Sequence, residues 1–237
     1  MTVAPPLIAR PSPNFNARDS AVPLSLVVLH YTGMATAEAA LDRLCDPRAE
    51  VSAHYVIDEQ GQTFQLVDEA ARAWHAGKSF WRGVRDVNSA SIGIELVNPG
   101  HAFGYRPFPA PQIAALKMRL HDLMRRHGLP AAALVGHSDV AVGRKDDPGE
   151  LFPWEDLAQE GLGLWPRPKA QDDGPATNDE VQGWLRALGY EVAADAPLST
   201  ALLAFQRHYH PKNLTGTPDA ETLARLRALL RGATDRP

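Results

Sequence analysis

Short apolar runs separated by turn signals dominate the first part of the chain. Leu24 to Leu29 is almost entirely apolar and leads into His30, which is the pattern of a buried strand that presents a polar residue at its end. The runs Val51 to Ile57 and Gln62 to Val67 flank a turn that contains Gly61, so we expect them to pair as a hairpin. The pattern therefore predicts a sheet that forms early in the chain.

Two further strands and a long helix follow this hairpin. In Ser91 to Val97 the side chains alternate, with three large apolar residues on one face and Glu95 on the other. From Pro111 to His127 apolar residues recur at helical spacing, and a glycine and a proline then end the helix. Ala133 to Gly136 is a further short strand that ends at His137. These elements predict an α/β domain with a mixed central sheet flanked by helices.

The last part of the chain has a purely helical pattern. A short helix is expected from Pro153 to Gln159, and residues 166–176 are rich in Pro and Asp, which predicts a linker. Thr177 and Glu180 then form a capping-box pattern, and three amphipathic segments follow. We expect four parts: an extended N-terminal arm (1–23), the α/β domain (24–165), the linker (166–176) and a small three-helix domain (177–237).

Composition and charge exclude several classes of function. The chain has 237 residues, 44% of them hydrophobic, which suffices for one sizeable core and a small second one. A net charge of −4 gives no attraction to nucleic acid, and no stretch approaches the roughly 20 apolar residues of a membrane helix. The first residues show no signal-peptide pattern, so we expect a cytoplasmic protein, or a periplasmic one if a leader precedes Met1. The oligomeric state stays open.

Two histidines stand where chemistry is expected. His30 and His137 each follow a predicted buried strand, a position where open sheets present functional groups. Asp146 and Asp147 lie in a charged loop after His137. Two imidazoles and one carboxylate on Zn²⁺ leave a fourth position for water, as in catalytic zinc sites. A separation of more than a hundred residues fits no short ligand motif, so structural histidines and a solvated charge cluster remain alternatives.

Five segments carry a resemblance to a known family. They are, in chain order, VVLHYTGM, SAHYVIDEQGQTFQLV, AWHAGKSFWRG, SIGIELVN and GHSDVAVGRKDDPGELFPW. Together they resemble the zinc-dependent N-acetylmuramoyl-L-alanine amidases of the AmpD and AmiD type, whose fold is shared with peptidoglycan recognition proteins. The resemblance covers about Leu24 to Trp165. It implies a hydrolase that cleaves the amide between N-acetylmuramic acid, including its 1,6-anhydro form, and L-alanine, in wall recycling or remodelling.

The resemblance also implies roles for individual residues. His30, His137 and Asp147 are the implied zinc ligands. Glu95 is the implied general base and Lys145 the implied donor to the oxyanion. Four residues are expected to line the substrate pocket: Trp74, His75, Asn88 and Arg144. For Arg144, the alternatives are an anchor for a substrate carboxylate and a brace for its own loop.

The C-terminal segments carry a second resemblance, and two other functions remain as alternatives to the amidase. VQGWLRALGY, STALLAFQRHY and GTPDAETLARLRALL resemble the three-helix peptidoglycan-binding domain found behind many wall hydrolases, which makes peptidoglycan fragments or polymer the expected partner. The main alternative is a non-catalytic peptidoglycan recognition protein, although such proteins lack a ligand and this chain has the whole implied set. An amidase that lyses walls from outside is a third reading, which needs export.

Overall fold

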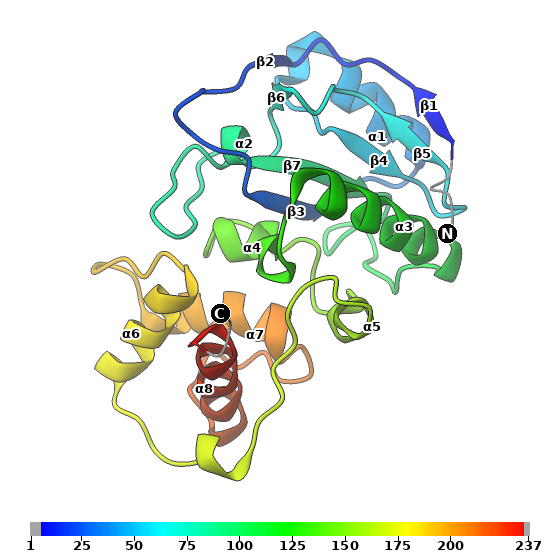
Figure 1. Cartoon of the computed structure of the whole chain (residues 1–237). Coiled ribbons are helices and arrows are strands. Elements are labelled where there is room, and N and C mark those ends of the chain that lie inside the picture. Colours follow the sequence, from blue (N-terminus) through cyan, green and yellow to red (C-terminus); the bar gives the residue numbers. More distant parts are fainter. Residues whose placement is uncertain (1–5, 235–237) are drawn as a thin grey trace.

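A six-stranded mixed sheet organises the first two thirds of the chain in the computed structural model, which describes residues 6–234 (Figure 1). The spatial strand order is β1-β5-β4-β7-β3-β8. Strands β4, β7, β3 and β8 run parallel, β5 is antiparallel to β4, and β1 is parallel to β5. The strands are β1 Leu7–Ala9, β2 Phe15–Ala17, β3 Leu26–Tyr31, β4 Tyr55–Ile57, β5 Thr63–Gln65, β6 Ala71–Ala73, β7 Ser91–Leu96 and β8 Leu134–Gly136. The mixed central sheet is thus confirmed.

Helices cover both faces of this sheet, and three more form a group of their own below it (Figure 1). The α-helices are α1 Ala37–Cys45, α2 Val87–Ala90, α3 Ala110–His127, α4 His137–Val140, α5 Trp154–Gln159, α6 Asn178–Leu188, α7 Leu198–Tyr209 and α8 Ala220–Thr234. Three short 3₁₀ helices are η1 Pro47–Ala49, η2 Ala131–Ala133 and η3 Ala170–Asp172. Alternation along β3 places Val27 and Leu29 in the core under α3, and Val28 in the core shared with the last three helices.

Most predicted elements are present, with bounds that differ by a few residues. The predicted hairpin forms from β4 and β5, and α3 ends at Gly128, whose φ of 63° is the left-handed conformation typical of a helix C-terminus. The capping box at the start of α6 is also present, because Thr177 N donates to Glu180 Oε2 at 2.8 Å. Helix α1 was not predicted; Thr36 caps it by accepting a hydrogen bond from Ala39 N.

The described part of the N-terminal arm takes part in both sheets. Strand β1 adds an edge to the main sheet by pairing with β5, and β2 pairs antiparallel with β6. Between them the side chain of Asn14 is buried and donates to the carbonyls of Asp46 and Val51. The described part of the arm therefore contributes to the fold through backbone pairing and buried hydrogen bonds.

The C-terminal helices pack against the α/β part of the chain. Their apolar residues Leu185, Phe205 and Leu226 belong to the same buried cluster as Val28 and Val135 of the central sheet. The expected linker is held as well: η3 lies within it, and its Asp172 Oδ2 is 2.6 Å from Arg231 Nη2 of α8. One continuous core therefore joins the two segments.

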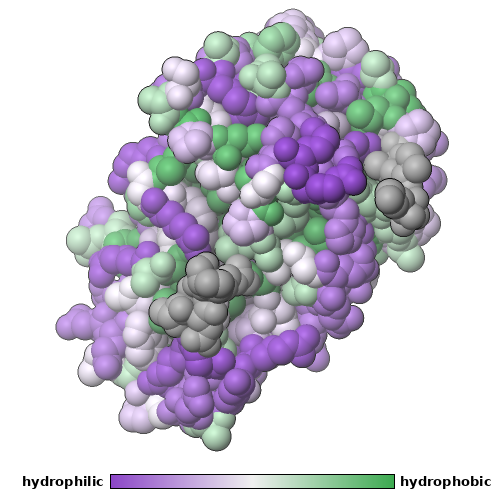
Figure 2. All heavy atoms as spheres, viewed as in Figure 1, coloured by the Kyte–Doolittle hydropathy of each residue, from purple (hydrophilic) through white to green (hydrophobic). Residues whose placement is uncertain are grey.

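Hydrophilic side chains cover most of the face drawn in Figure 2, where hydrophobic residues form small separate areas. Large apolar side chains at the surface include Phe103 and Phe15. Within residues 6–234, no helix combines the length and the apolar character that a membrane span requires.

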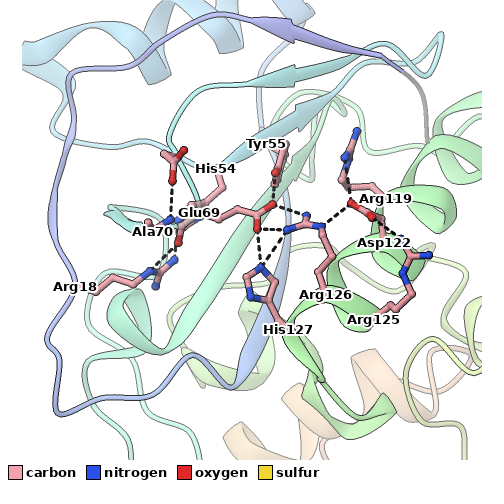
Figure 3. A network of polar contacts seen from close by, with 11 residues as sticks. Arg18, His54, Tyr55, Glu69, Ala70, Arg119, Asp122, Arg125, Arg126 and His127 are labelled. Carbon is pink, nitrogen blue, oxygen red and sulfur yellow. Dashed lines mark hydrogen bonds and ion pairs between the residues drawn. The ribbon is translucent and has the colours of Figure 1, made fainter. Parts of the chain in front are cut away.

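A network of hydrogen bonds and ion pairs connects the end of α3 to the sheet (Figure 3). Both carboxylate oxygens of Glu69 accept from Arg126 at 2.7 Å, and Oε2 lies 2.6 Å from His127 Nε2. Tyr55 of β4 donates its hydroxyl to Glu69 Oε1, and Arg18 donates to the Glu69 carbonyl at 3.0 Å. Glu69 thus links β4, α3 and the N-terminal arm.

Replacing Glu69 by Gln is expected to lower stability in a pH-dependent way. Burial favours a higher pKa for Glu69, but hydrogen bonds from Arg126, Tyr55 and His127 outweigh it and lower the pKa to about 2 from 4.5. Because the folded state has the lower pKa, the stabilisation is present above about pH 4.5 and is lost as pH falls towards about 2. We expect a cost of about 1–3 kcal/mol at neutral pH. Urea unfolding across this range measures it.

The control for this prediction is Glu155→Gln, which removes an exposed carboxylate at the start of α5. Its free energy of unfolding should follow that of the unmodified chain at every pH. A Glu69→Gln variant whose difference from the unmodified chain is the same at neutral pH and near pH 3 contradicts the assignment of a lowered pKa to Glu69.

Candidate functional site

Parallel pairing of two strands brings His30 and His137 together. Leu29 of β3 is in register with Gly136 of β8, so the next residue of each strand, His30 and His137, lies at the same edge of the sheet. Asp147 reaches the same point because its loop folds back onto α4, where Ser138 N donates to the Asp147 carbonyl at 2.8 Å. Three residues that are far apart in the sequence therefore converge.

The donor atoms of these three residues face one another at the distances of a metal site. His30 Nδ1 and His137 Nδ1 are 2.9 Å apart, and each lies 3.0 Å from Asp147 Oδ2. Ligands on tetrahedral Zn²⁺ with bonds of about 2.0–2.1 Å are separated by about 3.3 Å, so a shift of a few tenths of an ångström accommodates the ion. All three residues are buried, and no other group of three or more metal-binding side chains in residues 6–234 comes this close.

The protonation states that the environment favours are those of metal ligands. Burial and the neighbouring His137 lower the pKa of His30 to about 4, which keeps its imidazole neutral. Burial opposes ionisation of Asp147, but the imidazoles of His137 and His30 outweigh it and hold the pKa of this carboxyl well below its usual range. A neutral His30 imidazole beside an ionised Asp147 carboxylate can bind a divalent cation without these two groups releasing protons. The residues present therefore fit Zn²⁺.

A second layer of hydrogen bonds orients the two imidazoles. His30 Nε2 is 3.0 Å from His75 Nδ1. The second ring nitrogen of His75, Nε2, is 3.2 Å from Ser91 Oγ, which donates to the Val87 carbonyl at 2.5 Å. On the other ligand, His137 Nε2 donates to a backbone carbonyl at 3.1 Å. These contacts leave Nδ1 of both ligands free for a metal.

The fit of His75 depends on Gly93 of β7. A Cβ atom on Gly93 would overlap the His75 ring, so the close approach of ring and strand requires glycine here. The backbone of His75 is fixed from the other side, since His75 N donates to Asn88 Oδ1 at 3.1 Å. His75 is therefore held at both ends, which explains how it can orient a ligand.

Glu95 lies beside the metal ligands because of strand register. It is directly opposite His30 in the parallel pair β3–β7, and its side chain opens on the same cleft. Burial and the nearby Asp147 carboxylate raise the pKa of Glu95 well above its usual range, while Lys145 acts in the opposite direction. A cation among the ligands would also oppose this rise. Within the described residues Glu95 Oε2 has no hydrogen-bond partner, so it is available to a substrate or water.

A cleft of about 430 Å³ contains this group of residues. Its floor is the edge formed by the ends of β3, β7 and β8, and its walls come from the loop after β3, from α1 and from the loop 144–147. Exposed Lys145 stands on the wall beside the ligand loop. The lining therefore places two proposed catalytic groups, Glu95 and Lys145, around one volume with the three ligands.

The four residues expected to line the pocket have different positions. Trp74, His75 and Arg144 line the cleft. Arg144 uses its guanidinium to donate to the carbonyls of Ala76 and Lys78 at 2.6 and 3.0 Å, which favours the role of a loop brace over that of a substrate anchor.

Asn88 is not among the residues that line this cleft. Its buried amide oxygen accepts from the backbone N–H groups of His75 and Ala76, and this contact is what the residue contributes to the site. Asn88 reaches only the backbone under the ligand-orienting ring, because α2 sits behind that segment.

A comparison with protein families gives the identity of the fold. The family described as N-acetylmuramoyl-L-alanine amidase matches residues 20–150. The chain belongs to this amidase family. The match includes both histidines, the aspartate and both proposed catalytic residues of the site.

Individual relatives of this amidase extend the likeness to the tail. N-acetylmuramoyl-L-alanine amidase AmiD of Escherichia coli is 36% identical over 230 residues, which covers 87% of this amidase and 82% of the relative. A structure of that protein in complex with anhydro-N-acetylmuramic acid-L-Ala-D-γ-Glu-L-Lys has a TM-score of 0.81 at 35% identity, covering 93% and 94% of the two chains. AMPDH3 from Pseudomonas aeruginosa, in complex with an anhydromuramic pentapeptide, has a TM-score of 0.82 at 33% identity, with coverage of 89% and 92%.

Arg43 and Ser91 are among the residues of the amidase site that were not found from the sequence. Arg43 lines the cleft from α1, a helix that was not predicted, and the capping residue Thr36 was the available signal. Ser91, which supports His75, stands at the first position of β7 and has no motif that distinguishes it from a structural serine.

Proposed function

We propose that this amidase is a zinc enzyme that hydrolyses the amide between N-acetylmuramic acid and L-alanine in soluble anhydro-muropeptides. The observation that carries the proposal is the convergence of His30, His137 and Asp147 in one cleft with Glu95 and Lys145. Two relatives with high structural similarity over most of the chain are recorded with anhydromuramyl peptides, which supports the same class of substrate here.

The proposed chemistry assigns a task to each residue of the cleft. His30, His137 and Asp147 would hold the zinc ion, which, when bound, lowers the pKa of a coordinated water towards about 7 and polarises the scissile carbonyl. Glu95 accepts a proton from the attacking water and returns it to the nitrogen of L-alanine as the amide bond breaks. The Lys145 ammonium donates to the carbonyl oxygen as negative charge develops on it.

The alternative of a non-catalytic recognition protein is disfavoured by the same geometry. A protein that only binds muropeptides needs neither a general base beside the metal ligands nor a free buried oxygen on that base. Here Glu95 provides both, since it lies in register with His30 and its Oε2 has no partner in the described part of the chain.

Removing zinc is expected to abolish hydrolysis, because the proposed mechanism requires the metal ion to activate the attacking water. The purified full chain would be incubated with a 1,6-anhydro-muropeptide, with and without a chelator, and release of the peptide followed by chromatography. We expect no turnover after chelation and recovery on adding Zn²⁺. Full turnover by protein shown to be free of metal would overturn the proposed mechanism.

Intact sacculi in the same assay distinguish polymer from soluble fragments as the substrate. From the resemblance of residues 177–237 to a wall-binding module, we expect sacculi to bind the chain. We expect the anhydro-muropeptide to be cleaved faster than sacculi. The reverse order would contradict the proposed preference for soluble fragments without affecting the zinc mechanism.

A further inference from the structure

Two neighbouring residues of α7 contact the loop that carries the metal ligands. His208 Nδ1 lies 2.7 Å from Asp139 Oδ2, and their side chains are 1% and 0% exposed. Arg207 Nη2 lies 2.9 Å from Asp146 Oδ1. Asp139 is two residues after the ligand His137, and Asp146 immediately precedes the ligand Asp147. Helix α7 therefore binds the loop near both of its ligands, and Figure 1 shows α4 beside α7.

The carboxyl group of Asp139 is held by three donors. Besides His208, the Tyr190 hydroxyl donates to Oδ1 at 2.7 Å, and Gly136 N donates to Oδ2 at 2.7 Å. Gly136 directly precedes His137, so Asp139 closes the turn from which the ligand projects. A fully buried carboxyl with both oxygens engaged has one orientation, because any rotation breaks a hydrogen bond without access to water.

The donors from the C-terminal helices are themselves fixed by aromatic packing. The His208 ring stacks between Trp154 and Tyr209, with centroid distances of 3.7 and 3.8 Å. The Tyr190 ring packs edge-on against Trp81 at 5.0 Å. Since Trp81 and Trp154 belong to the α/β part of the chain, the two donors cannot move independently of it.

The turn held by Asp139 is connected to both ligands of the loop. His137 is its first helical residue, and Ser138 N donates to the carbonyl of Asp147 at 2.8 Å. A displacement of this turn therefore changes the position of His137 directly and that of Asp147 through the backbone contact. A side-chain network thus runs from α7 and from the end of α6 to two of the three metal ligands.

We propose that the C-terminal helices are a structural part of the metal centre. His208 and Tyr190 act as positioning residues: through Asp139 they fix the turn that presents His137, and so they set how tightly the metal is bound. The inference rests on the proposed zinc site. It gives the C-terminal helices a role in metal binding, which is separate from the wall binding that their resemblance suggests. Loss of outer partners that orient metal ligands typically weakens metal binding about 10–100-fold.

The test is the zinc affinity of full-length variants. His208→Phe keeps an aromatic ring between Trp154 and Tyr209 but has no donor, and Tyr190→Phe removes only a hydroxyl. Competition with a chromogenic chelator would give the Kd for Zn²⁺, and the absorption spectrum of the Co²⁺-loaded protein would report ligand geometry. We expect the double variant to bind Zn²⁺ about 10–100-fold more weakly, with a changed Co²⁺ spectrum.

A conservative variant and a matched control separate positioning from general stability. His208→Asn retains a side-chain N–H donor and should recover most of the affinity. Gln206→Leu alters the same helix at a fully buried residue whose hydrogen bonds go to Thr215, Gly216, Thr217 and Thr222. It should lower the melting temperature and leave the Kd for Zn²⁺ unchanged.

Three outcomes contradict the inference in different ways. Unchanged zinc affinity in the double variant overturns it while the proposed function stands. An equal loss of affinity in Gln206→Leu also overturns it, because the effect would then come from destabilisation of the helices. Failure of the unmodified chain to bind Zn²⁺ overturns the proposed metal site together with this inference.

Discussion

Glu95→Gln is expected to reduce kcat by about 10²–10⁴ while the protein keeps its metal and its fold. The amide of Gln has nearly the shape of the carboxylate but cannot accept the proton of the attacking water. Glu95 is not one of the three ligands, and its side chain opens on the cleft, so the substitution leaves no buried cavity. Steady-state kinetics on a 1,6-anhydro-muropeptide, zinc content by atomic absorption and the melting temperature together test this expectation.

Lys145→Ala provides the comparison for Glu95→Gln. Loss of an oxyanion donor typically lowers kcat by about 10²–10³ with little change in KM. The double variant should be little slower than the slower single variant, because both groups serve one transition state. A Glu95→Gln protein that has lost zinc would show that Glu95 supports the metal, and one with full turnover would remove it from the mechanism.

Deleting residues 166–237 is expected to leave an α/β part that does not fold stably. The deletion exposes the apolar side chains that face the last three helices, including Val28, Trp81 and Val135. Exposing about five large side chains costs about 7–15 kcal/mol, which is comparable to the whole stability of a typical domain. Circular dichroism during heating and peptide release from an anhydro-muropeptide would show loss of cooperative unfolding and of activity.

Supplying the deleted helices as a separate chain is the control for this prediction. If residues 1–165 and 166–237 are produced together, the shared core can form without a covalent connection, and we expect cooperative unfolding and activity to return. A fragment 1–165 that melts cooperatively and hydrolyses the substrate normally would show that the two parts are independent after all.

The sequence was informative where a residue's position follows from local pattern. His30 lies near the end of the buried strand β3, His137 directly follows β8, and alternation in β7 places Glu95 on the face opposite Ile92 and Ile94. The two histidines meet because β3 and β8 are parallel neighbours, and parallel strands end at the same edge of a sheet. The long family motifs then indicated which polar residues to propose as ligands and base.

Features that depend on packing between distant segments were not predictable in this way. Strands β1 and β2 have three residues each, too few for a period to appear, and they form because β5 and β6 offer partners. The amphipathic faces of α6 to α8 indicated that these helices are buried on one side, but they did not indicate which segment covers that side. In the structure they share a buried cluster with the central sheet. His208 acquires its partner Asp139 only in that arrangement.

The pairing of His30 with Glu95 across β3 and β7 limits how this sequence can change. The distance between the proposed metal ligand and the proposed base depends on the backbone hydrogen bonds of two adjacent strands, and only secondarily on side-chain conformation. A single residue gained within β7 before Glu95 would turn the carboxylate into the apolar core and bring Ile94 into the cleft, and a single residue lost there would bring Leu96 into the cleft instead. Insertions can therefore accumulate in the connections between the strands, whereas the length of these two strands is fixed by the reaction.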